Sequence, residues 1–415
     1  MEIPEMVRKM KILFVTTGAF PVPAVKGGAA EGLVELMLQE NEASDLADFT
    51  VISIYDEEAV KQSRNYRHTR FIFIKPGSFW KGCDSFNHFI AWNILHASNH
   101  LAFMTTWQRI DFMKQTAQIL DHEGFDKVVF ENQMALLWTL KYRQNLKKYK
   151  GKYYFHLHNH PAKYAKAETL AAGCAGIIPV SRFIGKAFAE HIGIPYTEEQ
   201  FHVVKNVVDE SIFDPKRLSS ADIESVCRKY VPEGQKLILY VGRLLPGKGV
   251  AELMEAFARM KTDNAVLVIV GSFNFNDKER SPYDEKLHDL MQKTNRKILF
   301  TGFVPHDRLS AYYASADLVV LPSTCEEAAG LTIIETMMMH RPLITTTMGG
   351  IPEYADKDCA VLVNNDENLV QNLADAADEL LNDQQRCEQM CRNSAALTKN
   401  WNKHQYLLNF LEALQ

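Results

Sequence analysis

The 415-residue sequence lacks an apolar run of the roughly 20 residues needed to cross a bilayer. Its first eleven residues are polar and lead straight into an apolar segment, so no signal peptide is expected. Disulfide patterning is missing too, because none of the seven cysteines has C-x-x-C spacing. Scattered cysteines in odd number favour reduced thiols over a disulfide framework or a zinc site. We therefore expect a cytoplasmic protein whose membrane contact, if it has one, is peripheral.

Strong net charge is absent as well. The formal charge is only -5, which argues against a nucleic-acid partner, since such proteins normally carry a basic footprint. The hydrophobic fraction of 47% and the charged fraction of 23% are those of an ordinary globular protein. A chain of this length exceeds what one hydrophobic core usually serves, so two domains are expected.

The first half of the chain alternates short apolar runs with helical patterns. Residues 11–17 are apolar, and a Gly/Pro-rich loop ending at Gly28 separates them from a helical pattern, which is how a doubly wound sheet begins. The runs are continuously apolar, as expected for parallel strands buried on both faces. Further strands are predicted at residues 50–54, 70–74, 127–130, 153–158, 174–179 and 201–205.

The same alternation starts again after a linker at residues 206–215. Strands are predicted at residues 236–241, 265–270, 297–300, 318–321, 343–346 and 360–363. The tail, residues 401–414, is predicted to be an amphipathic helix. The expected class is α/β, with two Rossmann-like doubly wound domains facing each other across a cleft. The first domain is expected to hold residues 1–205 with the C-terminal helix 398–415, and the second residues 206–397.

Residues 316–353 carry the most informative pattern. A predicted strand is followed by a loop with Glu327, and a helix beginning near Leu331 contains Glu335. The backbone amides of Gly330, Leu331 and Thr332 would be free at the helix start, which suits a diphosphate. Carboxylates nearby would accept sugar hydroxyls. An alternative is that both glutamates are simply solvated.

This order of residues, which runs from Pro322-Ser323 through Gly349-Gly350 to Glu353, resembles the E-x7-E region of family 4 glycosyltransferases, which are retaining enzymes with the GT-B fold. Four other segments resemble family motifs in the expected order along the chain. They are Gly27-Gly28 in the first loop, VVKNVVDESIF (203–213), YVGRLLPGKG (240–249) and TGFVPHDRLSAYYASAD (301–317).

The resemblance implies roles for individual residues. Arg243 and Lys248 would neutralise the donor diphosphate as leaving-group charge builds up, so that neither a metal ion nor another cofactor is required. Glu335 would accept the ribose hydroxyls, and Glu327 would hold the transferred sugar. The other expected donor-binding residues are Gly27, Gly28, Gly302, Phe303, Val304, Gly330, Leu331 and Thr332.

The segment FHLHNHP contains three alternating histidines, His156, His158 and His160. On an extended chain they would share one face, which by itself suggests a metal site. No acidic residue or cysteine is obviously paired with them. The resemblance implies instead that His158 faces the donor sugar, and structural histidines remain a further alternative. The expected catalytic residues are thus His158, Glu327, Arg243 and Lys248, with no metal.

Three positions depart from the family pattern. Asn206-Val207 stands where Asn-Gly would be usual, so this loop must differ. The segment from Glu327 to Gly330 lacks the usual Gly-Phe. His340 takes the place of a glycine that normally ends the helix. These changes bear on loop shape and donor specificity.

Two segments bear on how the protein could bind its acceptor and contact a membrane. Residues 79–112 are rich in Phe, Trp and His and could form an acceptor groove, an interfacial surface or helical core. Residues 141–152 hold six basic residues and no acid, which fits either an anionic membrane surface or a solvated helix end.

The resemblance implies a retaining transfer of a hexose or N-acetylhexosamine from a nucleotide sugar, by default a UDP-sugar. The acceptor would be a saccharide or a lipid-linked molecule in cell-surface polysaccharide or glycoconjugate synthesis. The expected location is cytoplasmic, with weak peripheral association at the inner face of the cell membrane. An inactive partner subunit and a nucleotide-sugar epimerase of the same fold are the alternatives. The sequence does not indicate an oligomeric state.

Overall fold

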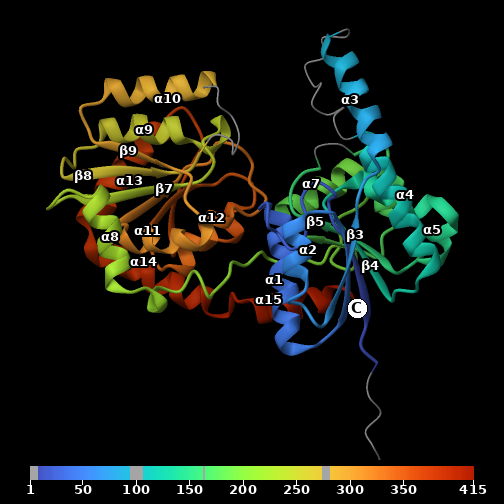
Figure 1. The fold of residues 1–415 in the computed structure, drawn as a ribbon. Coiled ribbons are helices and arrows are strands. Elements are labelled where there is room, and N and C mark those ends of the chain that lie inside the picture. Colours follow the sequence, from blue (N-terminus) through green and yellow to red (C-terminus); the bar gives the residue numbers. More distant parts are fainter. Residues whose placement is uncertain (1–7, 94–105, 162–163, 273–280) are drawn as a thin grey trace, which may run out of the picture. The chain divides into compact units, whose positions relative to one another are not determined.

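The computed structural model describes residues 8–93, 106–161, 164–272 and 281–415. The chain forms two compact units (Figure 1). Unit 1 contains the residues up to Lys205 together with Tyr406–Gln415, and unit 2 contains Asn206–Gln405. The chain returns to unit 1 inside helix α15 (Lys403–Ala413), somewhat later than the expected residue 398.

Unit 1 is built on a six-stranded parallel sheet in the order β3-β2-β1-β4-β5-β6. The order reverses between β1 and β4, which is the switch point of a doubly wound sheet. The predicted strand at residues 201–205 is wrong. In this segment only Phe201 forms a β-bridge, to Ile177 of the edge strand β6. A single bridge does not make a strand. The strands are β1 (Lys11–Val15), β2 (Asp48–Ile54), β3 (Thr69–Ile74), β4 (Lys127–Glu131), β5 (Tyr153–Leu157) and β6 (Gly176–Pro179).

The core of unit 1 is completed by the C-terminal helix α15. Phe14 of β1 lies 5.3 Å from Phe49 and 5.5 Å from Phe410, measured between ring centroids. The Tyr154 hydroxyl donates a hydrogen bond to the Leu414 carbonyl at 2.9 Å. The other helices are α1 (Ala29–Ser44), α2 (Glu57–Ser63), α3 (Ser78–Asn93), α4 (Thr106–His122), α5 (Asn145–Lys148), α6 (Glu168–Ala172) and α7 (Arg182–Ile192).

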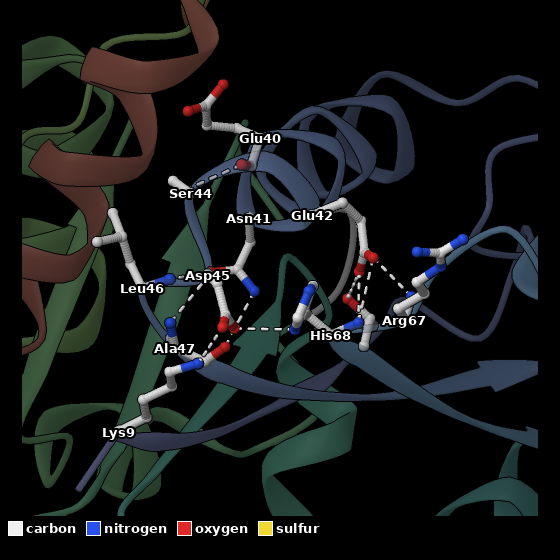
Figure 2. A network of polar contacts seen from close by, with 11 residues as sticks. Lys9, Glu40, Asn41, Glu42, Ser44, Asp45, Leu46, Ala47, Arg67 and His68 are labelled. Carbon is white, nitrogen blue, oxygen red and sulfur yellow. Dashed lines mark hydrogen bonds and ion pairs between the residues drawn. The ribbon is translucent and has the colours of Figure 1, made fainter. Parts of the chain in front are cut away.

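A polar network joins the end of α1 to residues that lie just before strands β1 and β3 of unit 1 (Figure 2). The Asn41 amide is fully buried, accepts from the Leu46 and Ala47 amides at 3.0 Å, and donates to the Ala47 carbonyl at 2.9 Å. Asp45 then pairs with Lys9 and with His68. A hollow of about 570 Å³ here lies at the amino ends of the strands, whereas open α/β sheets bind ligands at the carboxyl ends.

Unit 2 repeats the architecture, with strand order β12-β11-β10-β7-β8-β9 and its switch point between β7 and β10. The six predicted strands of this half are all present, and every residue of β8 is buried. The strands are β7 (Lys236–Val241), β8 (Ala265–Val270), β9 (Ile298–Gly302), β10 (Leu318–Leu321), β11 (Leu343–Thr346) and β12 (Ala360–Val363). The helices are α8 (Ser220–Tyr230), α9 (Val250–Arg259), α10 (Pro282–Lys293), α11 (Leu309–Ser315), α12 (Leu331–Met338), α13 (Leu369–Asn382) and α14 (Gln384–Leu397). The predicted α/β class with two Rossmann-like units, as in GT-B proteins, is confirmed.

The aromatic segment 79–112 divides into parts with different environments. Phe79, Phe86 and Phe89 on α3 are exposed, so the helical-core interpretation is wrong for them. Phe112 on α4 is buried. Residues 94–105 lie outside the described part of the chain. Among the helices that are described, none is long and apolar enough to cross a membrane.

Candidate functional site

Two loops of unit 2 pack against each other at the carboxyl ends of β7 and β10. The Gly247 carbonyl accepts hydrogen bonds from the amides of Thr324 and Cys325 at 3.0 and 3.1 Å. Gly249 has φ 72°, and a Cβ atom there would lie 1.8 Å from the Pro322 carbonyl oxygen. Glycine is therefore required for the two loops to approach this closely.

This packing brings together Lys248 and Glu327, two residues predicted to bind the donor. Their side chains form an ion pair and are both largely buried. The Ser323 hydroxyl donates to the same carboxylate at 2.5 Å. Behind the loop, the Gly350 amide donates to the Glu327 carbonyl at 2.7 Å. Arg243 lies exposed in the loop that holds Lys248. The site thus places one cation, Lys248, beside the Glu327 carboxylate, with Arg243 in the same loop as the lysine.

Glu335 lies on α12, where only 3% of the residue is exposed. Its carboxylate accepts hydrogen bonds from the Tyr313 hydroxyl at 2.7 Å and from His306 Nε2 at 3.0 Å. Burial acts to lower the pKa of His306, but the hydrogen bond and charge of Glu335 outweigh it, so the pKa is raised. The solvated-glutamate alternative is therefore wrong for Glu335, since both carboxylate oxygens have protein donors.

The remaining predicted residues of unit 2 also lie near the carboxyl ends of its strands. Gly330 has φ 73° and forms the N-cap of α12 without a side-chain cap, followed by Leu331 and Thr332 in the first turn. Gly302 ends β9 with φ 74°, and Phe303 beyond it is exposed. Val304 follows in the same loop, partly buried.

In unit 1, Gly27 and Gly28 precede α1 with φ values of 76° and 105°. A Cβ atom on Gly28 would lie 2.3 Å from Glu31 Oε2, so the glycine leaves room for a buried carboxylate. Glu31 accepts a short hydrogen bond from Thr17. Burial raises the pKa of Glu31, and the charge of Glu131 adds to the effect.

The histidine motif has an acidic partner, contrary to the prediction. Glu131, at the end of β4, accepts from His156 Nδ1 at 3.2 Å and from His158 Nε2 at 2.9 Å. The pairing was hidden because Glu131 and His156 are register partners on neighbouring strands, 25 residues apart. His160 does not share their face and instead lies near Phe183, with ring centroids 6.3 Å apart.

This buried trio has the composition of a two-histidine, one-carboxylate metal site. Hydrogen bonding accounts for its geometry equally well. Burial alone would raise the pKa of Glu131, but the charge and hydrogen bonds of both histidines lower it to about 2. Burial, together with the charge of His156, lowers the pKa of His158 to about 4.

Sequence reasoning missed Glu31 and Glu131 in unit 1, and His306, Tyr313 and Ser323 in unit 2. One signal was available in the sequence. Glu131 directly follows the apolar run VVF of β4, so it lies at the carboxyl end of the strand, where open α/β sheets bind ligands. The predicted residues Gly27, Gly28 and His158 belong to unit 1, and the others belong to unit 2.

Residues 224–396 match the profile of the family described as "Glycosyl transferases group 1". The chain is 28% identical to the putative glycosyltransferase YtcC of Bacillus subtilis, covering 93% of this chain and 86% of that protein. It is 27% identical to the lipopolysaccharide 1,2-N-acetylglucosaminetransferase of Salmonella typhimurium, over 60% of this chain and 63% of that one. Over residues 224–396 the chain thus resembles glycosyltransferases of group 1, and both relatives are named as glycosyltransferases.

Solved structures share the fold over nearly the whole chain. The Anabaena protein Alr3699/HepE, crystallised with UDP and glucose, aligns with a TM-score of 0.72 and 20% identity over 98% of this chain and 99% of that one. A glycosyltransferase from Rickettsia africae aligns with a TM-score of 0.73 and 20% identity, over 98% of both chains. At this level of identity the likeness establishes the fold alone.

Proposed function

We propose that the protein is a retaining glycosyltransferase that moves a hexose or N-acetylhexosamine from a UDP-sugar to a saccharide or lipid-linked acceptor. The observation that carries the proposal is the meeting of Lys248 and Glu327 at the β7/β10 switch point, next to the N-terminus of α12. The helix end and Lys248 suit a diphosphate, and the carboxylate suits sugar hydroxyls. The expected setting is cell-surface polysaccharide or glycoconjugate synthesis.

In this mechanism Arg243 and Lys248 stabilise the leaving diphosphate, so that no metal ion is required. Glu335 accepts the ribose hydroxyls, and the backbone of Gly302, Phe303 and Val304 frames the base. The acceptor hydroxyl attacks the anomeric carbon from the same face from which the diphosphate departs. The departing phosphate helps to remove the proton of that hydroxyl. His158 contacts the transferred sugar, and Gly27 and Gly28 allow backbone to approach the donor.

Donor binding tests the proposal directly. A thermal-shift panel of UDP, GDP, ADP and their sugar conjugates should show stabilisation by the UDP series alone, unchanged by EDTA or Mg²⁺. Glu335→Gln should abolish the shift, while the exposed-surface variant Lys61→Gln should keep it. Stabilisation that depends on Mg²⁺ would refute metal independence. Stabilisation by GDP alone would refute a UDP-sugar as the donor.

Turnover separates the transferase from its two alternatives. Incubation with the stabilising donor and candidate acceptors should yield a glycoside whose anomeric configuration, read by NMR, equals that of the donor. Binding without transfer or donor hydrolysis, across a broad acceptor panel, would favour an inactive partner subunit. Conversion of the donor into its epimer would favour the epimerase.

Weak peripheral membrane association at the cytoplasmic face belongs to the same proposal. It is supported by the exposed Phe79, Phe86 and Phe89 on α3 and by exposed lysines in residues 141–152. Sedimentation with anionic liposomes should fall steeply as salt rises. Serine substitution at Phe79 and Phe86 should reduce the bound fraction, whereas equal sedimentation with neutral liposomes would refute the electrostatic part.

A further inference from the structure

Two consecutive residues at the end of β4 hold His158 by different groups. The Glu131 carboxylate accepts from the imidazole Nε2 at 2.9 Å. The Asn132 side-chain oxygen accepts from the His158 backbone amide at 3.0 Å and from the Asn159 amide at 3.2 Å. Asn132 Nδ2 then donates to the Asn159 side chain at 2.9 Å. One residue therefore orients the ring, and its neighbour fixes the backbone that carries it.

The contact with Glu131 determines which ring nitrogen of His158 carries hydrogen. An ionised carboxylate can only accept, so Nε2 must be the donor. The pKa of Glu131 is lowered to about 2 and that of His158 to about 4, so near neutral pH the carboxylate is ionised and the imidazole is neutral. Nδ1 is consequently left with a lone pair, and it is buried without a hydrogen-bond partner among the described residues.

The backbone of Asn132 is itself in an unusual state. Its φ is 48°, in the left-handed region that residues other than glycine enter uncommonly, although Asn does so more than most. Such conformations persist where surrounding structure holds them, and they cluster at functional sites. Here the left-handed turn directs the Asn132 amide toward the end of β5. The turn is thus part of what fixes His158.

The location of this arrangement points to substrate chemistry. Glu131 and His158 lie at the carboxyl ends of β4 and β5, beside the β1/β4 switch point of unit 1. Ligands of open α/β sheets bind at such a point. A buried acceptor nitrogen without a partner is costly, and a ligand hydroxyl would satisfy it.

We propose that Glu131 and Asn132 are positioning residues that present His158 as a neutral imidazole, with Nδ1 as the acceptor for a hydroxyl group of the sugar substrate. This inference rests on the proposed function, because it assigns His158 a part in sugar binding and transfer. It differs from a metal centre at the same trio, in which both histidines would use the nitrogens facing Glu131 to bind the ion.

The first test reads the tautomer and does not depend on activity. Long-range ¹H–¹⁵N spectra of histidine-labelled full-length protein, with His158→Asn to identify the resonances, should show His158 neutral and protonated at Nε2 near neutral pH. Glu131→Gln should mix the two tautomers, because an amide can donate to Nε2 as well as accept from it. His160→Gln should leave the His158 signals unchanged.

The second test separates positioning from folding. Glu131→Gln should lower kcat by about 10- to 100-fold, the loss expected for one hydrogen bond to a charged group, with KM for the donor changed by less than about threefold. Asn132→Gly keeps the left-handed turn but loses the amide and should lower kcat by about tenfold. Asn132→Asp keeps the acceptor oxygen and should retain most of the wild-type kcat. If Glu131→Gln unfolds the protein, the two Asn132 variants carry the test.

Distinct results would overturn the inference. His158 protonated at Nδ1 or charged near neutral pH, or a kcat that Glu131→Gln and Asn132→Gly leave unchanged, would each refute the positioning role. One equivalent of metal that copurifies with the protein and is lost in Glu131→Gln would replace it with a metal centre. Absence of transfer by the wild type with every donor would refute the proposed function instead, and the spectra would still decide the hydrogen bonding.

Discussion

Lys248 and Glu327 form an ion pair that joins two loops 79 residues apart in the sequence. The proposed function gives each partner a different part of the same donor, the cation the diphosphate and the carboxylate the sugar. Glu327→Gln should therefore lower sugar transfer at least tenfold while UDP affinity stays equal or rises, because Lys248 loses its competing anion. Lys248→Met should lower UDP affinity by about tenfold.

Calorimetric titration with UDP measures both variants, and the Ser323→Ala variant serves as a milder control that keeps the ion pair. Equal losses of UDP affinity in Glu327→Gln and Lys248→Met would mean that the two residues act only as a structural pair.

Stability should depend on pH through His306, whose ring contacts the Glu335 carboxylate. The pKa of His306 is raised in the folded protein, so its contribution is fully present below the ordinary histidine pKa of about 6.5 and is lost as pH rises through the higher folded value. Denaturant midpoints of the wild type should thus fall as pH rises above the ordinary histidine pKa of about 6.5.

His306→Gln should flatten that part of the pH profile. The Tyr313→Phe variant should keep the pH dependence, although it removes a hydrogen bond from the same carboxylate at 2.7 Å. A profile that His306→Gln leaves unaltered would assign the titration to another group.

Gly349 should tolerate no side chain. It has φ 63°, and a Cβ atom would lie 2.4 Å from the Glu327 carbonyl oxygen and 2.7 Å from its amide nitrogen. Gly349→Ala should displace the Glu327 loop and lower donor binding by at least tenfold, with a stability loss of about 1–3 kcal/mol. Gly32→Ala on α1 has open space and is the matched control, for which a small gain in stability is expected. Normal donor binding in Gly349→Ala would show that the loop can relax.

His340 should be improved by glycine. The residue has φ 51° and follows Met339, the C-cap of α12, and its amide donates to the Met337 carbonyl at 3.0 Å, so it occupies the left-handed position of a helix C-terminus. His340→Gly should stabilise the protein by about 1 kcal/mol in denaturant unfolding, because the Cβ penalty disappears. His340→Ala keeps the penalty and should not stabilise. A destabilised His340→Gly would mean that the imidazole contributes more than its strained backbone costs.

Asn41 should be needed for the stability of unit 1. Its amide satisfies two backbone amides and one carbonyl of the turn between α1 and β2, as Figure 2 shows. Asn41→Ala leaves these buried groups without partners and should cost about 2–4 kcal/mol. Ser44→Ala, which removes one partly buried hydrogen bond, should cost less than about 1 kcal/mol in the same measurement. Similar losses in the two variants would contradict this account.

The two-unit α/β architecture could be predicted because its signals are local. Twelve predicted apolar runs became parallel strands, and such runs can be recognised without knowledge of their neighbours. The exception is informative. Residues 201–205 have the strand composition, but only Phe201 bonds as an isolated bridge, to Ile177. Whether an apolar segment becomes a strand depends on the partner edge, which composition does not specify.

The candidate site in unit 2 could be predicted in part for the same reason. Glu327, Gly330 and Glu335 lie within one loop-helix segment, where spacing reveals their relation. The contact of Lys248 with Glu327 required the tertiary fold, because Gly249 and Pro322 must touch first. Tyr313 and His306 at Glu335 were hidden likewise, since each lies more than 20 residues away in the sequence.

Sequence alone therefore determined where strands and helices form and which loops hold glycines and charged side chains, because these depend on neighbouring residues. Only the tertiary structure decided which side chains meet. Glu131 had no visible relation to His158 until parallel pairing placed β4 beside β5. The pairing decides the charge and tautomer of the imidazole, because a buried group takes its protonation state from the groups around it.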